Sequence, residues 1–507
     1  MTTLQAFEPF TLWQTQGQKE VSIDRSRGWK RVCAVLLMCA AAAIASPAQT
    51  LKTLASFTGT NGDEPYLATL VQSNNGNFYG TTQYGGTHTG TDCSLGCGTV
   101  FEVSPAGKLT TLYDFCSQAN CADGSVPTAG LVQGGNGNFY GTTSLGGPKN
   151  FGTVFEITPA GKLTTLYAFC SVTGCTDGEF PSGALIQATN GNFYGTTVEG
   201  GTNSLGTVFG ITPAGKLTTL HSFDGTDGAL LQAGLIQATN GDFYGTATLG
   251  GTGRTCSGGG CGTVFKITPG GTLTTLHSFD GTDGEYLYAG LVQATNGNFY
   301  GTTYLGGAND YGTVFEITSG GTLTTMHSFD FTDGAEPLGG LVQARTGNFY
   351  GTTSAGGSIG AGTVFEITAA GTLTTLYNFC TATECEDGEL PATGLVQGTN
   401  GDLYGTTFGG GSGGTLGDGT VFSLAVGLQP FVEAQPTSGE VGRPIRILGT
   451  DLTGATSVTF NGTAAVFKVV SSSLITTTVP AGATTGNVQV VTPSRTLTSN
   501  KKFHVLP

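Results

Sequence analysis

Cysteines occur in close pairs along this chain of 507 residues, which contains twelve of them. Paired cysteines are typical either of disulfides in an exported protein or of zinc ligands. No second pair and no histidine follows any pair at the spacing of a zinc site, so we predict five local disulfides. The predicted disulfides join Cys93 to Cys97, Cys116 to Cys121, Cys170 to Cys175, Cys256 to Cys261, and Cys380 to Cys385.

Aspartates recur directly before glycines, and some have a second aspartate three residues earlier. Asp-Gly is good turn chemistry, because Asp bonds to the nearby backbone and Gly adopts positive φ. Clustered carboxylates also bind calcium, although the alternating acidic ladder of a dedicated calcium loop is missing. We favour structural turns and predict no cofactor. The alternative calcium ligands are Asp224, Asp227, Asp280, Asp283, Asp330 and Asp333.

Histidine is too scarce and too regularly placed to indicate catalysis. His221, His277 and His327 share one position of a repeated segment, and other copies have tyrosine there. A residue that exchanges with tyrosine indicates packing more than acid–base chemistry. No Ser-His-Asp, Cys-His, phosphate-loop or metalloprotease motif is present. We therefore predict no catalytic residue. The residues that break the repeat, which form no known catalytic set, are Lys149, Glu199, Arg254, Asp310 and Arg345.

The elements that position these residues come from a sequence repeat. A phrase close to NFYGTT occurs seven times, followed each time by a segment close to GTVFEIT. Each full copy contains four short segments rich in β-branched and aromatic residues, separated by glycine-rich turns. In the fifth copy we expect strands at 290–293, 299–303, 313–318 and 323–329. Four strands at this period favour a propeller blade. The tyrosines of the seven phrases are Tyr79, Tyr140, Tyr194, Tyr244, Tyr300, Tyr350 and Tyr404.

The first and last copies complement each other. The seventh copy ends at Leu424 without the LTTL segment, and a matching segment precedes the first copy at 51–57. Pairing that segment with the seventh sheet would satisfy an exposed sheet edge and close a ring. We therefore predict an all-β fold, a seven-bladed β-propeller closed by an N-terminal strand.

The loops of the predicted ring differ between its two faces. On one face the turns are short and nearly identical in every copy, whereas on the other the loops vary and carry the cysteine pairs. Variable loops on a rigid scaffold are where binding function usually resides, although drift in unconstrained loops gives the same pattern.

Residues 1–48 are predicted to be a leader, with Arg25, Arg27, Lys30 and Arg31 before an apolar run at 32–44. That run is too short for a membrane span, and we expect none in the mature chain. We expect a secreted or cell-surface monomer. The formal charge of −15 argues against nucleic acid as a partner. The predicted domains are this leader, a propeller at 49–427 and a third domain at 428–507.

The third domain has short alternating strands with Gly and Pro turns. Its segments at 436–442, 447–449, 458–462 and 479–486 resemble an IPT/TIG domain, which implies an immunoglobulin-like sandwich acting as a spacer or adhesive unit.

The repeats, through GLVQxxNGNFYGTT, GTVFEITPAG and LTTLYxF over about 51–424, resemble the GloVer tandem repeats of bacterial choice-of-anchor proteins. That resemblance implies an exported repeat protein and assigns no reaction. The ITPAGKLTTL wording is distantly similar to seven-bladed streptogramin lyases, without their histidine and glutamate pair. We therefore expect a non-enzymatic protein that binds an extracellular protein or glycan through its variable-loop face. The alternatives are a secreted lyase or hydrolase acting at the central channel, and a structural surface protein.

Overall fold

The computed structural model describes residues 49–506, apart from 254–255, 257–258 and 413–416. The predicted leader at 1–48 lies outside the described residues. The described chain is β-structure throughout, and its helical segments are three short 3₁₀ turns. These turns are η1 (Ala119–Cys121), η2 (Thr173–Cys175) and η3 (Thr383–Cys385).

Each sequence repeat folds into one antiparallel four-stranded sheet, because its apolar segments alternate with glycine-rich turns. In blade 5, strand β19 (Phe299–Thr303) pairs with β20 (Thr313–Ile317). The glycine in the middle of β19 is required by packing. A Cβ atom on Gly301 would lie 2.6 Å from the ring of Phe315.

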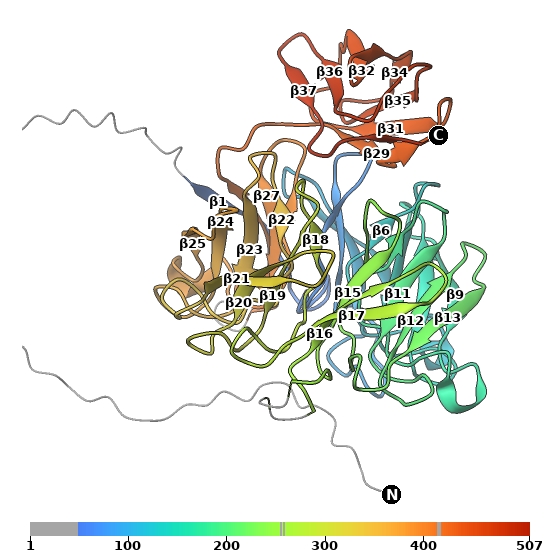
Figure 1. The fold of residues 1–507 in the computed structure, drawn as a ribbon, viewed down its shortest axis with the longest axis vertical. Helices are drawn as coiled ribbons and strands as arrows, with labels where there is room; N and C mark the ends of the chain where they lie inside the picture. Colours follow the sequence, from blue (N-terminus) through green and yellow to red (C-terminus); the bar gives the residue numbers. More distant parts are fainter. Residues whose placement is uncertain (1–48, 254–255, 257–258, 413–416, 507) are drawn as a thin grey trace, which may run out of the picture. The chain divides into compact units, whose positions relative to one another are not determined.

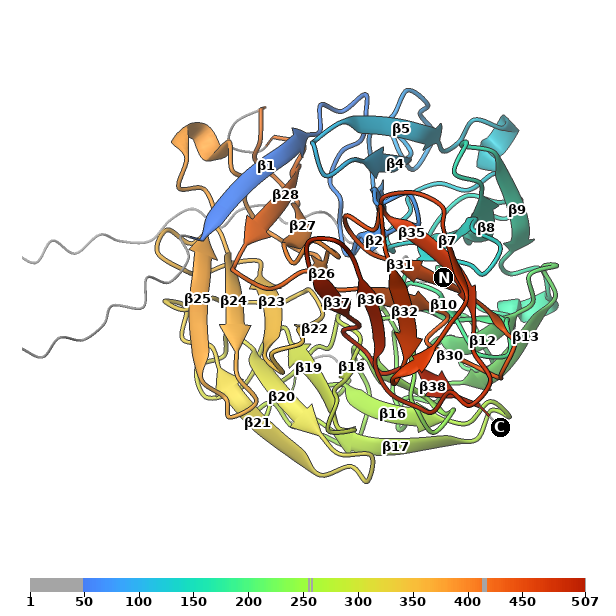
Figure 2. The same cartoon turned by 90° about the horizontal axis from the view of Figure 1, so that it is seen from above.

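The blades follow one another around a common centre (Figure 2). The strands of the first four are β2 (Val71–Gln72), β3 (Phe78–Thr82), β4 (Thr99–Val103) and β5 (Leu109–Asp114); β6 (Val132–Gln133), β7 (Phe139–Thr143), β8 (Thr153–Ile157) and β9 (Leu163–Ala168); β10 (Ile186–Gln187), β11 (Phe193–Thr197), β12 (Thr207–Ile211) and β13 (Leu217–Ser222); and β14 (Ile236–Gln237), β15 (Phe243–Ala247), β16 (Thr263–Ile267) and β17 (Leu273–Ser278).

Blade 5 also contains β18 (Val292–Gln293) and β21 (Leu323–Ser328). Blade 6 comprises β22 (Val342–Gln343), β23 (Phe349–Thr353), β24 (Thr363–Ile367) and β25 (Leu373–Asn378). The innermost strand of each blade is shorter than predicted. Residues 290–291, which we expected in a strand, instead lie in the link that approaches the neighbouring blade, where a Cβ on Gly290 would be 3.1 Å from the Gly234 carbonyl oxygen.

Blade 7 closes the ring as the sequence predicts. Its strands are β26 (Val396–Gln397), β27 (Leu403–Thr407; orange in Figure 1) and β28 (Thr420–Ala425). They are completed by β1 (Thr50–Ser56), which pairs antiparallel with β28 (Figure 2). A β-bulge between Thr53 and Ala55 interrupts this pairing. The outer edge of the seventh sheet is therefore covered by the first strand of the described chain.

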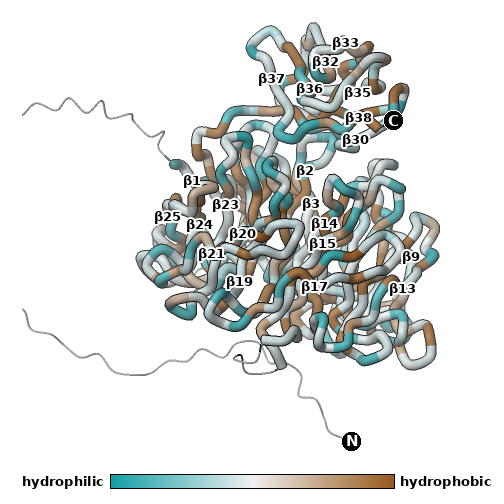
Figure 3. Tube along the Cα trace, viewed as in Figure 1, coloured by the Kyte–Doolittle hydropathy of each residue, from teal (hydrophilic) through white to brown (hydrophobic). Residues whose placement is uncertain are grey.

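Aromatic stacks connect neighbouring blades. The tyrosine of the NFYGTT segment packs on the phenylalanine of the next copy in blades 1 to 5, as in Tyr244 and Phe299, whose ring centroids are 4.0 Å apart. In blade 7 a leucine, Leu403, replaces this phenylalanine, and Tyr350 of blade 6 shares a hydrophobic cluster with it. Across the closure, Phe78 of blade 1 stacks on Tyr404 of blade 7 at 3.9 Å. Hydropathy along the chain alternates between apolar strand segments and polar loops (Figure 3).

Residues after the propeller form a sandwich with its own core, which includes Ile447, Val458, Phe460, Ile475 and Val490. Its strands form two four-stranded sheets and one parallel pair. The first sheet contains β29 (Glu433–Gln435), β31 (Pro444–Leu448), β35 (Leu474–Thr478) and β34 (Phe467–Val469); the second contains β33 (Thr463–Ala464), β32 (Ser457–Phe460), β36 (Val488–Val491) and β37 (Thr496–Thr498); and the pair is β30 (Ser438–Gly439) with β38 (His504–Val505). The predicted fold class is confirmed.

Candidate functional site

The links between blades share one unusual backbone residue. In every link, one non-glycine residue has positive φ, a conformation that costs about 1–2 kcal/mol for an L-residue. In the link to blade 5, the amide of Tyr286 donates to the Cys261 carbonyl (3.1 Å), and the Tyr286 carbonyl accepts from the Tyr304 amide (3.0 Å). The backbone of this residue therefore connects adjacent blades through two hydrogen bonds. The seven residues are Glu64, Val126, Phe180, Leu230, Tyr286, Glu336 and Leu390.

We call the residue two positions after each of these positive-φ residues the link position. Its side chains differ among the seven copies. They are half-buried or buried, so solvent exposure does not explain the variation. Most of them line the channel at the centre of the ring. The link position is occupied by Tyr66, Thr128, Ser182, Gln232, Tyr288, Leu338 and Ala392.

A second variable position directly follows the second strand of each blade, and we call it the exit position. It neighbours the link position: Thr128 and Ser144 share a hydrogen bond of 2.7 Å. The exit residues also differ from copy to copy and are half-buried or buried. They are Gln83, Ser144, Val198, Thr248, Tyr304, Ser354 and Phe408.

Aromatic side chains from blades 1, 5 and 7 gather at these positions. The rings of Tyr288 and Tyr304 pack edge to face with centroids 5.3 Å apart, and Tyr66 packs on Phe408 at 5.9 Å. The Tyr304 hydroxyl donates to Oε2 of Glu336 (2.9 Å), which fixes its ring. Burial and the proximity of the Tyr288 hydroxyl raise the pKa of Tyr66 to about 12. Tyrosines from blades 1 and 5 therefore share one region of the channel.

The channel contains a cavity of about 290 Å³. Its walls are formed by link residues and by the first residues of the inner strands, among them Thr69, Gln232, Tyr288, Leu338 and Ile236. Among the described residues that line it, none is Asp, Glu, Lys, Arg, His or Cys. In a protein with a formal charge of −15, the cavity is an uncharged region.

Comparison of the sequence with models of protein families identifies the family of the repeats. The sequence model of the Gloeobacter/Verrucomicrobia repeat matches residues 42–258 and 252–464. This chain belongs to the Gloeobacter/Verrucomicrobia repeat family. The IPT/TIG domain model matches residues 431–505 of this repeat protein, so both resemblances are confirmed. No curated protein matches the sequence.

Solved structures share the fold of this repeat protein. A fungal alcohol oxidase of the AA5 family, in complex with copper, is 13% identical with a TM-score of 0.51, over 90% of this chain and 99% of that one. The extracellular domain of a hybrid two-component system from B. thetaiotaomicron is 14% identical with a TM-score of 0.45. The match covers 90% of this chain and 58% of that chain, so the repeat protein spans less than two thirds of its length. At these identities the likeness concerns the fold alone.

The link to blade 1 of this repeat protein carries two neighbouring acidic groups, Asp63 and Glu64, with raised pKa values. Burial, followed by the carboxylates of Asp63 and Asp418, raises the pKa of Glu64 from its usual 4.5 to about 7. Burial and Asp418 raise the pKa of Asp63 to about 6. A carboxyl group whose pKa is higher in the folded state destabilises the fold as the pH rises through that interval.

Glu64→Gln is therefore expected to stabilise the protein at about pH 8 by about 1 kcal/mol, a value that allows for partial solvent screening. At about pH 4 wild type and variant should be equally stable, because Glu64 is then protonated in both the folded and unfolded states. Guanidinium denaturation at the two pH values measures this difference. The exposed Glu386→Gln provides the control. A variant less stable than wild type at about pH 8 would contradict the prediction.

The Asp-Gly aspartates accept hydrogen bonds inside their links. Long, disulfide-bonded links have a tyrosine donor, as in Tyr113 to Asp123 (2.8 Å). Short links have a histidine at the same strand position, as in His221 to Asp227 (2.6 Å). Tyrosine and histidine exchange there because both can bond to the same carboxylate.

The structure brings the six candidate calcium ligands together only in pairs within single links. In the first pair, Asp224 Oδ1 accepts from the amide and hydroxyl of Thr226, and Asp227 Oδ1 accepts from the Asp224 amide. Within the described chain, no group of three metal-ligating side chains includes any of the six. Their carboxylates thus serve the turns, and calcium binding stays a prediction.

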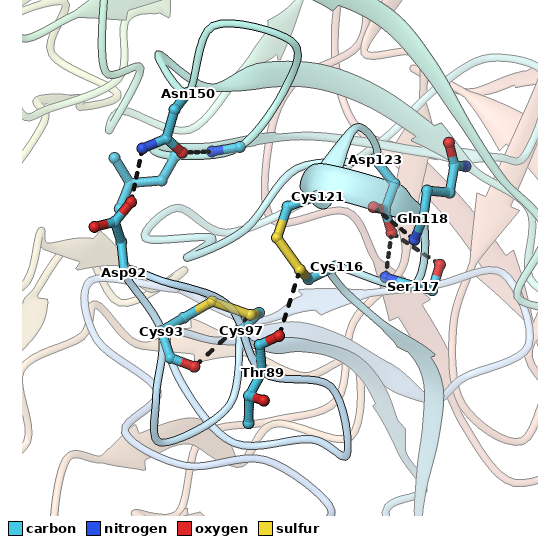
Figure 4. The surroundings of a disulfide bond; sticks show 12 residues. Thr89, Asp92, Cys93, Cys97, Cys116, Ser117, Gln118, Cys121, Asp123 and Asn150 are labelled. Carbon is cyan, nitrogen blue, oxygen red and sulfur yellow. Dashed lines mark hydrogen bonds between the residues drawn. A yellow bond between two sulfur atoms is a disulfide. The ribbon is translucent and has the colours of Figure 1, made fainter.

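All five predicted disulfides form. Each closes a short loop, which stabilises the fold by roughly 2 kcal/mol through the entropy of the unfolded chain. The sequence spacing did not indicate that two of the pairs lie close together in space. Cys93–Cys97 and Cys116–Cys121 lie side by side, with the four sulfur atoms within 4.8 Å (Figure 4). Strands β4 and β5 bring the blade 1 loop beside the link that follows it, and this adjacency depends on the fold.

The channel residues were not among the sequence candidates. The sequence candidates were charged residues that break the repeat, and the structure places the described ones outside the cavity lining: the backbone of Glu199 bridges to Glu179, and Lys149 donates to the Cys170 carbonyl. Arg254 lies outside the described residues. The signal that could have indicated the channel residues is the uncharged link position, whose residue type changes from copy to copy.

No helix in the described ranges has the length and apolar character needed to cross a membrane.

Proposed function

We propose that this protein is an exported, non-enzymatic binding protein whose ligand occupies the channel cavity. The observation that carries the proposal is the uncharged cavity of about 290 Å³, to whose lining five of the seven variable link residues contribute. Ligand pockets in proteins are mostly apolar with a few placed polar groups, and this cavity has that composition. Five disulfides and the predicted leader support export.

Binding is favoured over catalysis by the chemistry of the lining. General acid–base catalysis needs a titratable group whose pKa is near the working pH. The titrating side chain in the described lining is Tyr288, and burial raises its pKa above the usual value of 10. It is therefore a poor proton donor or acceptor near neutral pH and a good aromatic contact.

Tyr288→Ala tests whether the channel or the outer loops bind the ligand. Residues 49–507 are screened by differential scanning fluorimetry against small neutral and charged compounds, with and without calcium. We expect neutral compounds to raise the melting temperature of the wild type and to lose this effect in Tyr288→Ala, because truncation of a central aromatic contact typically costs at least about 2 kcal/mol of binding.

Tyr311→Ala is the matched control, since Tyr311 packs on Phe331 in a variable loop and does not line the cavity. Its response to ligands should match the wild type. Binding that survives in Tyr288→Ala and fails in Tyr311→Ala would move the site to the loops. Conversion of a bound compound into product, detected by mass spectrometry, would establish the enzyme alternative.

A further inference from the structure

The cavity wall contains polar side-chain groups that are available for hydrogen bonds to a ligand. Within the described residues, the Gln232 amide and the hydroxyls of Thr69 and Tyr288 form no hydrogen bond with another side chain or with the backbone. These groups are not fully buried, so a ligand can reach them. All three groups are neutral, and each offers both a donor and an acceptor. A ligand that satisfies them must itself carry neutral hydroxyl or amide groups.

Polar and aromatic side chains line the cavity from several blades. Thr69 of blade 1, Ser182 of blade 3 and Gln232 of blade 4 contribute two hydroxyls and an amide. The Ser182 hydroxyl shares a hydrogen bond of 3.3 Å with Thr128, which leaves further acceptor capacity on it. Tyr288 of blade 5 contributes an aromatic ring, and we call its ring and the ring of Tyr304 packed against it the aromatic wall. The rest of the lining consists of aliphatic side chains and glycines, such as Ile186, Ile236 and Leu338.

The aromatic wall is held in place before any ligand arrives. Tyr304 is fixed by its hydrogen bond to Glu336, and its ring lies nearly perpendicular to that of Tyr288, with an interplanar angle of 88°. A preorganised aromatic face lowers the entropy cost of binding a flat apolar surface.

From these features we infer that the ligand is the end of a neutral saccharide, an inference that rests on the proposed function. A pyranose ring has an apolar C–H face for the ring of Tyr288 and hydroxyls for Thr69, Ser182 and Gln232. The cavity lies near the lower limit of ligand pockets, about 300 Å³, which suits one or two sugar rings. A lipid chain would leave these polar groups unsatisfied, and a charged ligand would find no counter-ion in the described lining.

The cavity lining selects against acidic saccharides. The described lining contains no cationic side chain to pair with a carboxylate, and the chain as a whole has a formal charge of −15. Uronate-containing chains of the same length are expected to bind at least about ten-fold more weakly than neutral chains, and high salt should narrow this difference.

A glycan array followed by isothermal titration calorimetry, both with residues 49–507, tests the inference. The array carries neutral and uronate-containing oligosaccharides, and uncharged dipeptide amides of similar size serve as non-sugar probes. We expect a neutral saccharide to bind, Tyr288→Ala to weaken binding at least about 30-fold, and Gln232→Ala to weaken it about 5- to 20-fold. Tyr311→Ala should bind like wild type.

The outcomes distinguish failure of the saccharide inference from failure of the proposed function. If a dipeptide amide binds in a Tyr288-dependent manner and no saccharide does, the saccharide inference is overturned and the proposed function stands. Preferential binding of uronate chains also overturns the inference. If no compound binds, or if a bound saccharide is cleaved, both fail. Circular dichroism spectra of each variant exclude misfolding as the cause of lost binding.

Discussion

Phe57→Ala is expected to lower the free energy of unfolding by about 3–5 kcal/mol, the cost typical of removing a buried phenylalanine. Phe57 directly follows β1 and is 1% exposed. Its ring packs on Phe101 of blade 1 with centroids 5.1 Å apart, and its amide donates to the Gly419 carbonyl of blade 7 (2.9 Å). The substitution leaves a cavity where the last blade meets the first. Guanidinium denaturation followed by circular dichroism measures the loss.

Lys52→Ala provides the control for this experiment. Lys52 lies in β1 and its side chain is exposed, so its truncation should change the free energy of unfolding by no more than about 0.5 kcal/mol. Equal stability of the two variants would mean that β1 does not hold the ring closed. Deletion of residues 49–57 should be more severe still, since it exposes the edge of β28 as well as the core.

Asp123→Ala is expected to cost about 3–5 kcal/mol, because it removes a fully buried acceptor on which several hydrogen bonds of the link converge. Asp123 is fully buried at 0% exposure. Its Oδ2 atom accepts from the Tyr113 hydroxyl (2.8 Å) and the Ser117 amide (3.0 Å), and Oδ1 accepts from the Gln118 amide (3.2 Å) (Figure 4). Loss of these bonds loosens the link that contains Cys116–Cys121. Denaturation gives the energy, and limited proteolysis within 115–124 reports the local opening.

Asp224→Ala serves as the comparison in a short link. Asp224 is exposed and accepts from Thr226, so its removal should cost no more than about 1 kcal/mol. The contrast between buried and exposed aspartates follows from their roles as hydrogen-bond acceptors in turns. A calcium-dependent rise in the melting temperature that disappears in Asp224→Ala would instead support the calcium prediction.

Much of the fold could be predicted from the sequence because the information is local and repeated. Seven copies of one strand pattern define the blades, and the LTTL segment missing after Leu424 and present at 51–57 indicates the closure. The disulfides were predictable for the same reason, since each joins cysteines only four or five residues apart. The inner strands were overestimated, because the close approach of neighbouring links at Gly290 is a contact between blades.

The candidate site could not be predicted in the same way. The sequence candidates were charged residues that break the repeat, such as Glu199. The variable residues that line the channel are instead uncharged and include tyrosine, glutamine and leucine. From the sequence alone, a variable residue that lines a channel cannot be distinguished from one that varies by neutral drift, because the direction of its side chain is unknown. At the link position, that orientation depends on a positive-φ residue two positions earlier, such as Tyr286 before Tyr288.

The sequence by itself determined the number of blades, the strand that joins the ends, the disulfide partners and the presence of a second, sandwich domain, because short-range periodicity and spacing encode each of these. Only the tertiary structure decided which variable residues face one another across the channel, that the cavity is uncharged, and that Cys93–Cys97 lies beside Cys116–Cys121. Those facts depend on how blades far apart along the chain pack around one centre.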